Sequence, residues 1–166
     1  MKKISAAIAL AIAVSALSMS AHAKKTQVVR APGGTSISPL GIAIDASYDP
    51  RLDTLAPGYK VINVALVNES FNVVFLNPDK DRWEIKLAGD GKTVTAIHDL
   101  RRKDPKAWSA IPERARGLMG YPLALPVGAR EVVDIFVPDT VDVAQFNELD
   151  VYLRSADMKI EVLVRQ

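Results

Sequence analysis

The chain has 166 residues, of which 49% are hydrophobic and 24% are charged, and it has no cysteine and a formal net charge of +2. This length fits one domain with a sizeable apolar core, and the missing cysteine excludes disulfides and lipid attachment at a thiol. The weak net charge argues against nucleic acid as the main partner, because proteins that bind nucleic acid are usually basic.

The first 23 residues have the three parts of a secretory signal peptide. Lys2 and Lys3 form a positive n-region, residues 4–17 form an apolar h-region, and residues 21–23 (AHA) form a cleavage motif. The apolar run is shorter than the roughly 18 residues of a membrane-spanning helix. We therefore expect cleavage after Ala23 and a periplasmic or secreted bacterial protein without a transmembrane segment. Its charge would be balanced, because 21 Lys and Arg less the two in the signal leaves 19, against 19 Asp and Glu.

Residues 24–36 carry basic residues, proline and paired glycines but little apolar periodicity, which predicts a flexible lead-in. The remaining residues, 37–166, are predicted to form a single domain. Within it, strands are predicted where apolar residues recur at every second position or form a short continuous run. These segments are 42–47, 59–68, 71–76, 83–87, 93–98, 133–137, 149–153 and 160–164.

The seven or eight short strands are separated by turn sequences and lack the helical crossovers that a parallel sheet requires. The pattern therefore predicts a mainly β fold, an antiparallel sandwich of two sheets. An open or closed β-barrel is the alternative architecture.

One segment, about 99–120, departs from the strand pattern and predicts a short helical insert. Asp104 can cap a helix whose first residue is Pro105, and Pro112 then divides the segment into two short helical turns. Apolar residues at helical spacing form one stripe, namely Trp108, Ile111, Ala115 and Leu118. We expect the insert to lie over one end or edge of the sandwich, with Trp108 as its anchor.

Two long segments carry a family resemblance. VINVALVNESFNVVFLNPDKDRWEIKL and IFVPDTVDVAQFNELDVYL, with the helical insert between them and a closing hairpin, resemble small exported bacterial proteins with immunoglobulin-like β-sandwich folds. The resemblance covers nearly the whole mature chain. It implies the immunoglobulin-like fold, and it implies no catalytic or binding residue, since many such families have no assigned activity.

The stretch that begins at Asn77 has the opening pattern of a calcium-binding loop. Asn77, Asp79 and Asp81 match the first three ligand positions of an EF-hand. The sixth position, which should be glycine, is Arg82, and the twelfth, which should be glutamate, is Ala88. We therefore interpret the stretch as a turn before a strand and predict no metal site there.

Catalytic and metal-binding motifs are missing from the mature chain. His98 is its only histidine, which argues against a zinc site in a chain without cysteine. Asp99 would point to the opposite face of a strand, so a Ser-His-Asp triad is not predicted and His98 is expected to be exposed at a hairpin end. No nucleotide-binding glycine motif is present. We predict no catalytic residue, metal or cofactor, although two of the 19 Asp and Glu could still pair as in a glycosidase.

Positive charge is concentrated in the insert. Between Arg101 and Arg116, two acidic residues lie among six cations, and these cations are Arg101, Arg102, Lys103, Lys106, Arg114 and Arg116. They predict a ligand-binding patch that faces an anion, which would be a phosphate-bearing envelope lipid, an acidic polysaccharide or an acidic envelope protein. The alternative is that these long side chains only solvate short helices and cover apolar surface with their stems.

These features predict an exported, non-enzymatic β-sandwich module that binds or stabilises another envelope component. The alternative function is a polysaccharide-binding module in which Trp83, Trp108 or Tyr121 forms a stacking platform. A carboxylate-based hydrolase without a recognisable motif is the third hypothesis.

Overall fold

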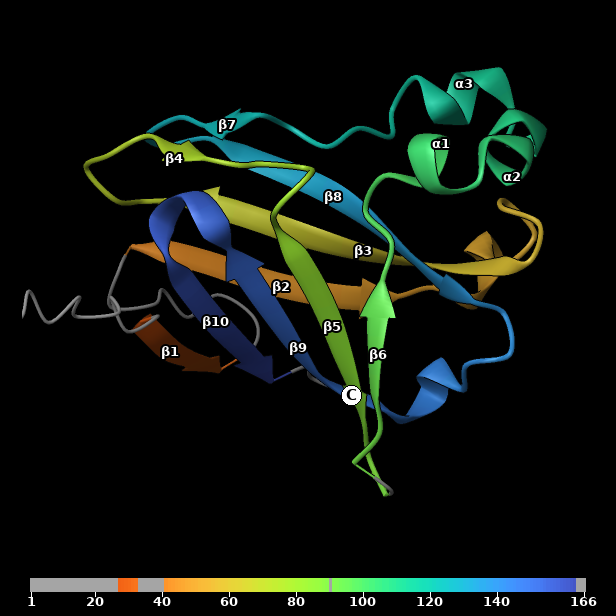
Figure 1. The fold of residues 1–166 in the computed structure, drawn as a ribbon, viewed down its shortest axis with the longest axis horizontal. Coiled ribbons are helices and arrows are strands. Elements are labelled where there is room, and N and C mark those ends of the chain that lie inside the picture. Colours follow the sequence, from red (N-terminus) through yellow and green to blue (C-terminus); the bar gives the residue numbers. More distant parts are fainter. Residues whose placement is uncertain (1–26, 33–40, 90, 164–166) are drawn as a thin grey trace, which may run out of the picture.

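The protein is described by a computed structural model that covers residues 27–32, 41–89 and 91–163. The expected signal peptide, residues 1–23, lies outside these residues. The described part is mainly β, with ten strands and three short α-helices (Figure 1). The strands are β1 (Gln27–Pro32), β2 (Ile42–Tyr48), β3 (Tyr59–Asn68), β4 (Val74–Phe75), β5 (Arg82–Leu87), β6 (Thr93–Ala96), β7 (Ala124–Leu125), β8 (Arg130–Pro138), β9 (Phe146–Leu153) and β10 (Met158–Leu163). The helices are α1 (Leu100–Lys103), α2 (Pro105–Ala110) and α3 (Glu113–Arg116), and single 3-10 turns lie at η1 (Pro50–Leu52), η2 (Val143–Gln145) and η3 (Arg154–Ala156).

The strands form a five-stranded sheet, a three-stranded sheet and a small two-stranded sheet. Their orders are β1-β10-β9-β5-β6, β2-β3-β8 and β4-β7. All neighbours are antiparallel except β1, which pairs in parallel with β10. Strand β1 lies in the segment that was expected to be a flexible lead-in. The prediction missed this strand because it is formed by backbone pairing with β10 and shows no apolar periodicity. The rest of residues 24–36 lies outside the described residues.

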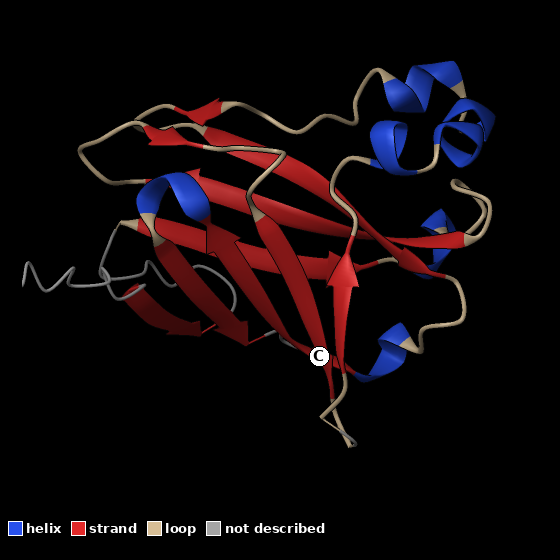
Figure 2. Cartoon of the chain, in the orientation of Figure 1, coloured by secondary structure: helices blue, strands red, loops and turns tan. Residues whose placement is uncertain are grey.

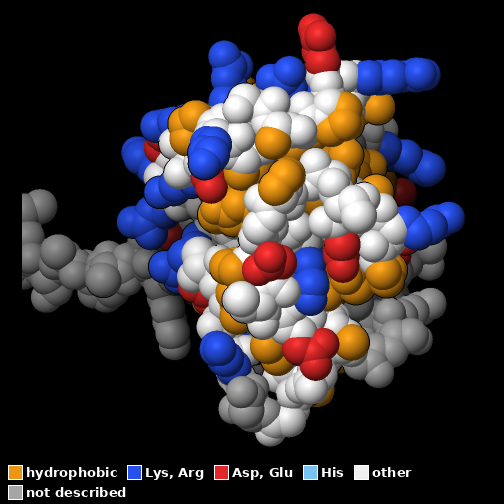
Figure 3. All heavy atoms as spheres, turned by 90° about the vertical axis from the view of Figure 1, so that its right-hand side faces the viewer, with side chains coloured by type: hydrophobic (Ala, Val, Ile, Leu, Met, Phe, Trp, Pro, Cys, Tyr) orange, Lys and Arg blue, Asp and Glu red, His pale blue; other side chains and the backbone are white. Residues whose placement is uncertain are grey.

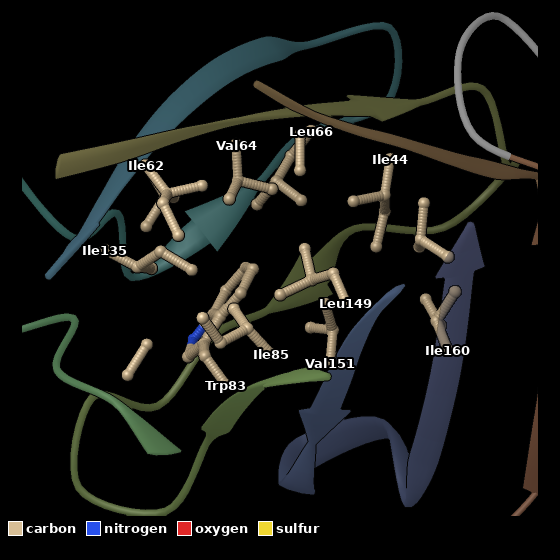
Figure 4. Packing of buried hydrophobic residues seen from close by; sticks show 14 of the residues in the cluster. Ile44, Ile62, Val64, Leu66, Trp83, Ile85, Ile135, Leu149, Val151 and Ile160 are labelled. Atoms are coloured by element: carbon tan, nitrogen blue, oxygen red, sulfur yellow. The ribbon is translucent and has the colours of Figure 1, made fainter. Parts of the chain in front are cut away.

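The two larger sheets face each other across one apolar core (Figure 4). Side chains from β5, β9 and β10, including Trp83, Leu149 and Ile160, point toward side chains from β2, β3 and β8, including Ile44 and Ile62. Successive residues of a strand point to opposite faces, and the buried positions alternate as the sequence pattern predicts. Trp83 is fully buried, with 0% of its surface exposed.

The predicted strand segment 71–76 is shorter than expected, and β7, like β1, was not predicted as a strand. Only Val74–Phe75 of the segment 71–76 is a strand, and its partner β7 has just two residues. A strand of two residues forms because a distant segment pairs with it and not because of local propensity. The periodicity of the sequence therefore predicts neither the length of β4 nor its pairing with β7.

The helical insert lies over one end of the sheets (Figure 2) and begins as the sequence predicts. The Asp104 side chain accepts a hydrogen bond from the backbone N–H of Ala107, and Pro105 is the first residue of α2. Pro112 separates α2 from α3. Helix α1 is an additional turn, which Asp99 caps. The hydroxyl of Tyr59 donates to Asp104 Oδ2 at 3.1 Å and ties the insert to the start of β3.

The expected anchor of the insert is only partly correct. A second buried cluster joins the insert to β3 and β8, and it consists of Ala56, Val61, Leu100, Ala107, Ile111 and Phe136. Trp108 is only partly buried against this cluster, and Leu118 is 83% exposed. Ala115 also packs against this cluster, so of the predicted apolar stripe only Leu118, which follows the end of α3, turns to solvent.

No helix in the described ranges is long and apolar enough to cross a membrane.

Candidate functional site

The six cations of the insert are distributed over its three short helices. Arg101, Arg102 and Lys103 belong to α1, Lys106 belongs to α2, and Arg114 and Arg116 belong to α3. Figure 3 looks at this end of the molecule and shows Lys and Arg side chains around its margin, with apolar side chains between them.

Four of the six cations are exposed and form no salt bridge with any described residue. We call Arg101, Lys103, Lys106 and Arg114 the basic face. Within the basic face, Lys106 lies near the carboxylate of Asp104. The pKa of Asp104 is lowered mainly by the hydrogen bond from the backbone of Ala107, and Lys106 makes a smaller contribution. The basic face therefore offers positive charge to solvent that the described part of the protein leaves largely uncompensated.

The other two cations of the insert are engaged differently. Arg102 forms a salt bridge with Asp79 and a longer one, 3.8 Å, with Asp99. The hydrogen bond to Asp79 raises the pKa of Arg102 above its ordinary value. Arg116 is partly buried, and its Nε is covered without a hydrogen-bond partner among the described residues. Both residues contribute less free charge than the sequence suggests.

A cleft of about 510 Å³ lies beside the basic face, between the Asn77–Asp81 turn, the end of β6 and α1. Asp79, His98, Arg102 and Lys103 contribute to its walls. The cleft thus contains both signs of charge, with Lys103 shared between its wall and the basic face.

The Asn77–Asp81 turn is closed by hydrogen bonds within the protein. The Asp81 carboxylate accepts from the backbone N–H of Asn77 (2.6 Å) and of Arg154 (2.8 Å), and from the Tyr121 hydroxyl (2.8 Å). The Asn77 side chain accepts from the backbone N–H of Asp79 at 3.0 Å. Since the oxygens that would bind calcium already accept protein hydrogen bonds, the geometry supports a structural turn.

His98 is not the exposed hairpin-end residue that the sequence predicts. It is partly buried, its Nε2 lies 2.8 Å from the carbonyl oxygen of Pro78, and its ring centroid lies 4.6 Å from that of Tyr121. Burial and the neighbouring carboxylate of Asp81 raise the pKa of Tyr121. Tyr121 connects the turn, His98 and the core, and no local pattern indicates this because its partners are distant in sequence.

A smaller pocket of about 170 Å³ lies on the other side of His98, where Trp108, Tyr121 and Asp134 contribute to its walls. Burial raises the pKa of Asp134, and a 2.5 Å hydrogen bond from the Asn63 side chain partly opposes that rise. A partly buried carboxylate with a raised pKa has the character of an acid catalyst.

Replacing Asp134 by Asn should make the protein relatively more stable as the pH rises. Because the folded-state pKa is raised, the parent loses stability as the pH rises from the ordinary Asp value of about 3.9 through the folded-state value. Asparagine does not titrate, so the variant does not lose this stability. Above about pH 4 its unfolding free energy should therefore increase relative to that of the parent. Urea unfolding at several pH values measures this shift. Asp139→Asn, at an exposed position, is the control. If the unfolding free energies of parent and Asp134→Asn depend equally on pH, the prediction is wrong.

A second charged cluster covers the outer face of the five-stranded sheet. Glu148, Asp150 and Glu161 form the one group of three potential metal ligands among the described residues, with their ligand atoms within 4.8 Å of one another. Lys159 lies 2.8 Å from Asp150 and 2.7 Å from Glu161, and Lys86 lies 3.1 Å from Asp150 and also contacts Glu148. Two ammonium groups therefore already provide the positive charge that a metal would bring.

Of the three aromatic residues considered for a stacking platform, Trp83 lies in the core, whereas Trp108 and Tyr121 are partly exposed and line the smaller pocket. Trp83 is buried and donates its Nε1–H to the Tyr121 hydroxyl at 3.3 Å. The two rings meet edge to face with centroids 6.2 Å apart. Trp108 is partly buried against the insert. Trp83 in particular cannot stack on a sugar, because its ring belongs to the core.

Comparison with known proteins identifies no family, since no protein-family model, curated protein or solved structure matches the chain. The function is therefore inferred from the geometry and charge of this chain alone.

Proposed function

We propose that this protein is an exported, non-enzymatic binding module with an immunoglobulin-like sandwich fold, and that its basic face binds an anionic component of the bacterial envelope. The single observation that carries the proposal is the exposure of Arg101, Lys103, Lys106 and Arg114 at one end of the molecule without salt bridges to described residues.

Export is proposed from the signal-peptide pattern of residues 1–23, with cleavage after Ala23 and a periplasmic or secreted location. The immunoglobulin-like description is supported by the two larger sheets that share one core, whose strand neighbours other than β1 and β10 are antiparallel.

The distribution of charge favours an anion over other ligands. Outside the insert and residues 24–36, acidic residues outnumber basic ones in the mature chain. A basic end on an otherwise acidic molecule orients the protein as it approaches a negatively charged surface. Arginine and lysine also form charge-assisted hydrogen bonds to phosphate and carboxylate oxygens.

The test is retention on anionic phospholipid vesicles and on an acidic polysaccharide, each over a salt series. We expect binding to weaken from about 0.01 M to about 1 M salt, over which the screening length falls from about 30 Å to about 3 Å. Replacing Arg101, Lys103, Lys106 and Arg114 by Gln should abolish retention on whichever surface the parent binds. Thermal melts should stay close to those of the parent, because each exposed substitution changes stability by no more than about 0.5 kcal/mol.

A matched control removes four exposed cations outside the insert, namely Arg51, Lys80, Lys92 and Arg154. This variant has the same net charge as the first and should still be retained. If the variant of the basic face is retained like the parent at every salt concentration, those cations only solvate the helices. Equal loss in both variants would mean that net charge, rather than the basic face, determines binding.

A further inference from the structure

Three apolar side chains stand in solvent where the chain leaves β3 and enters β4. Phe71 is 97% exposed, Phe75 is 63% exposed and Val73 is 46% exposed. They occur at every second residue, while Leu76, between the ridge and the turn, is buried and Val74 is partly buried. Asn72, between Phe71 and Val73, is exposed as well, and the chain bends at residues 70–72 before β4 begins, so the three apolar side chains lie on an exposed bend and the short strand that follows it.

The neighbouring segment extends the same surface. Phe75 pairs with Ala124 across β4 and β7, and the backbone N–H of Leu76 donates to the carbonyl of Leu123 at 2.9 Å. Leu123 and Val127, on either side of β7, are also exposed. We call the five exposed residues the apolar ridge: Phe71, Val73, Phe75, Leu123 and Val127.

The ridge is held in place by a buried polar side chain. Asn68, with 0% exposure, donates from its amide to the carbonyls of Asn72 and Leu125, both at 2.8 Å. Its amide oxygen accepts from the Ser70 N–H at 3.0 Å and from the Ser70 hydroxyl at 2.6 Å. The Ser155 hydroxyl also donates to the carbonyl of Phe75. These contacts fix both segments of the ridge, so the exposure of Phe71 belongs to an ordered part of the fold.

The ridge is free of charge. Residues 70–78 and 117–129 contain no Asp, Glu, Lys or Arg, in a chain of which 24% is charged. Large exposed apolar patches on soluble proteins usually mark sites of protein or membrane interaction.

The ridge and the basic face lie along one margin of the molecule. In Figure 1 the helices α1–α3 and the strands β4 and β7 occupy the same upper margin, and residues 117–123 run along it from α3 to β7. Leu118, which is 83% exposed, follows α3 directly and begins this uncharged connection. Cations are thus at one end of the margin and the apolar ridge at the other.

We propose that this margin docks on the surface of a bilayer that contains anionic lipid. This inference rests on the proposed function and names its anionic component. The basic face contacts headgroup phosphates, and the apolar ridge inserts Phe71 and Phe75 at the boundary between headgroups and acyl chains. Peripheral binding of this kind depends on buried apolar area together with attraction to anionic lipid.

A bilayer accounts for both halves of the margin, which the other candidate occupants do not. An acidic polysaccharide would bind the basic face and leave the apolar ridge in water. A second copy of the chain could cover the uncharged ridge, but it carries the same basic face and offers no anion to it. An anionic bilayer offers negative charge and apolar depth side by side.

The experiment measures co-sedimentation of the full mature protein with phosphatidylglycerol/phosphatidylethanolamine vesicles and with phosphatidylcholine vesicles. Phe71→Ser with Phe75→Ser should weaken binding to the anionic vesicles roughly tenfold or more. The control, Val132→Ser with Leu163→Ser, removes two exposed apolar side chains outside the ridge and should bind like the parent. A Phe71→Trp variant should give a blue-shifted emission that brominated lipid quenches.

Each outcome decides for or against insertion. If the double phenylalanine variant binds anionic vesicles like the parent while the variant of the basic face does not, binding is electrostatic only, and the proposed function survives without this inference. If the parent binds the acidic polysaccharide but neither vesicle, the bilayer is the wrong ligand. If the parent is a dimer in solution and the double phenylalanine variant is a monomer, a second copy covers the ridge. The last two results also overturn the inference.

Discussion

Replacing Asp81 by Ala should lower the free energy of unfolding by about 3–5 kcal/mol, because one substitution removes the acceptor of three hydrogen bonds. The residue is 5% exposed and receives the backbone N–H groups of Asn77 and Arg154 and the Tyr121 hydroxyl. A buried donor left without a partner costs about 1–3 kcal/mol, and the three donors come from separate segments that the carboxylate holds together.

Urea unfolding of parent and variant measures this loss. Asp79→Ala is the matched control, because it makes the same change two residues away at an exposed position. It should change stability by about 0.5 kcal/mol or less. Equal losses in the two variants would show that the turn does not depend on Asp81. A rise in melting temperature on adding calcium, abolished in both variants, would instead identify the turn as a calcium site.

Replacing Asp150 by Ala should destabilise the protein by about 3–5 kcal/mol, since it breaks a buried ionic cluster and leaves two ammonium groups facing each other. Asp150 is 1% exposed and lies within salt-bridge distance of both Lys86 and Lys159. Burial alone would lower the pKa of Lys159, but the hydrogen bonds to Asp150 and Glu161 outweigh it and raise that pKa.

A double-mutant cycle separates the ionic contribution from the change of volume. Adding Lys159→Met to the Asp150→Ala background should recover part of the lost unfolding free energy, because it removes the repulsion between the Lys86 and Lys159 ammonium groups once the carboxylate between them is gone. Since the pKa of Lys159 is raised, its contribution is complete below the ordinary lysine value of about 10.4 and declines only above it. The decrease in unfolding free energy caused by Asp150→Ala should therefore be the same at about pH 6 and about pH 9. A double variant less stable than Asp150→Ala alone would contradict this account.

The proposed export is compatible with the proposed lipid contact of this margin, because a bacterial envelope contains lipid surfaces that an exported protein can reach. The two surface tests separate the contributions of charge and of apolar contact. The variants at Asp81 and Asp150 test the stability of the fold. Asp81 lies six residues after Phe75 and accepts a hydrogen bond from Tyr121, two residues before Leu123, so its variant is not used to test the proposed binding.

Local sequence signals predicted the features that depend on neighbouring residues. The alternation of apolar residues in β2, β5 and β9 follows from the two-residue repeat of a strand, and the structure confirms those segments. The start of α2 at Pro105 and the break at Pro112 follow from capping and from the missing proline N–H. The six cations of the insert were also identified from sequence, because clustered charge is visible without a fold.

The sequence by itself determined a mainly β chain with a basic helical insert, since strand periodicity, helix caps and charge clustering act over a few residues. Only the tertiary structure decided which cations are both exposed and without a salt bridge to a described residue, because Arg102 meets Asp79 from a distant turn and Arg116 is partly covered. It also decided the apolar ridge: the segment 71–76 has the pattern of a core strand, yet pairing with β7 and the buried Asn68 turn Phe71 and Phe75 outward. Which face of a strand is buried depends on what packs against it, and that partner is distant along the chain.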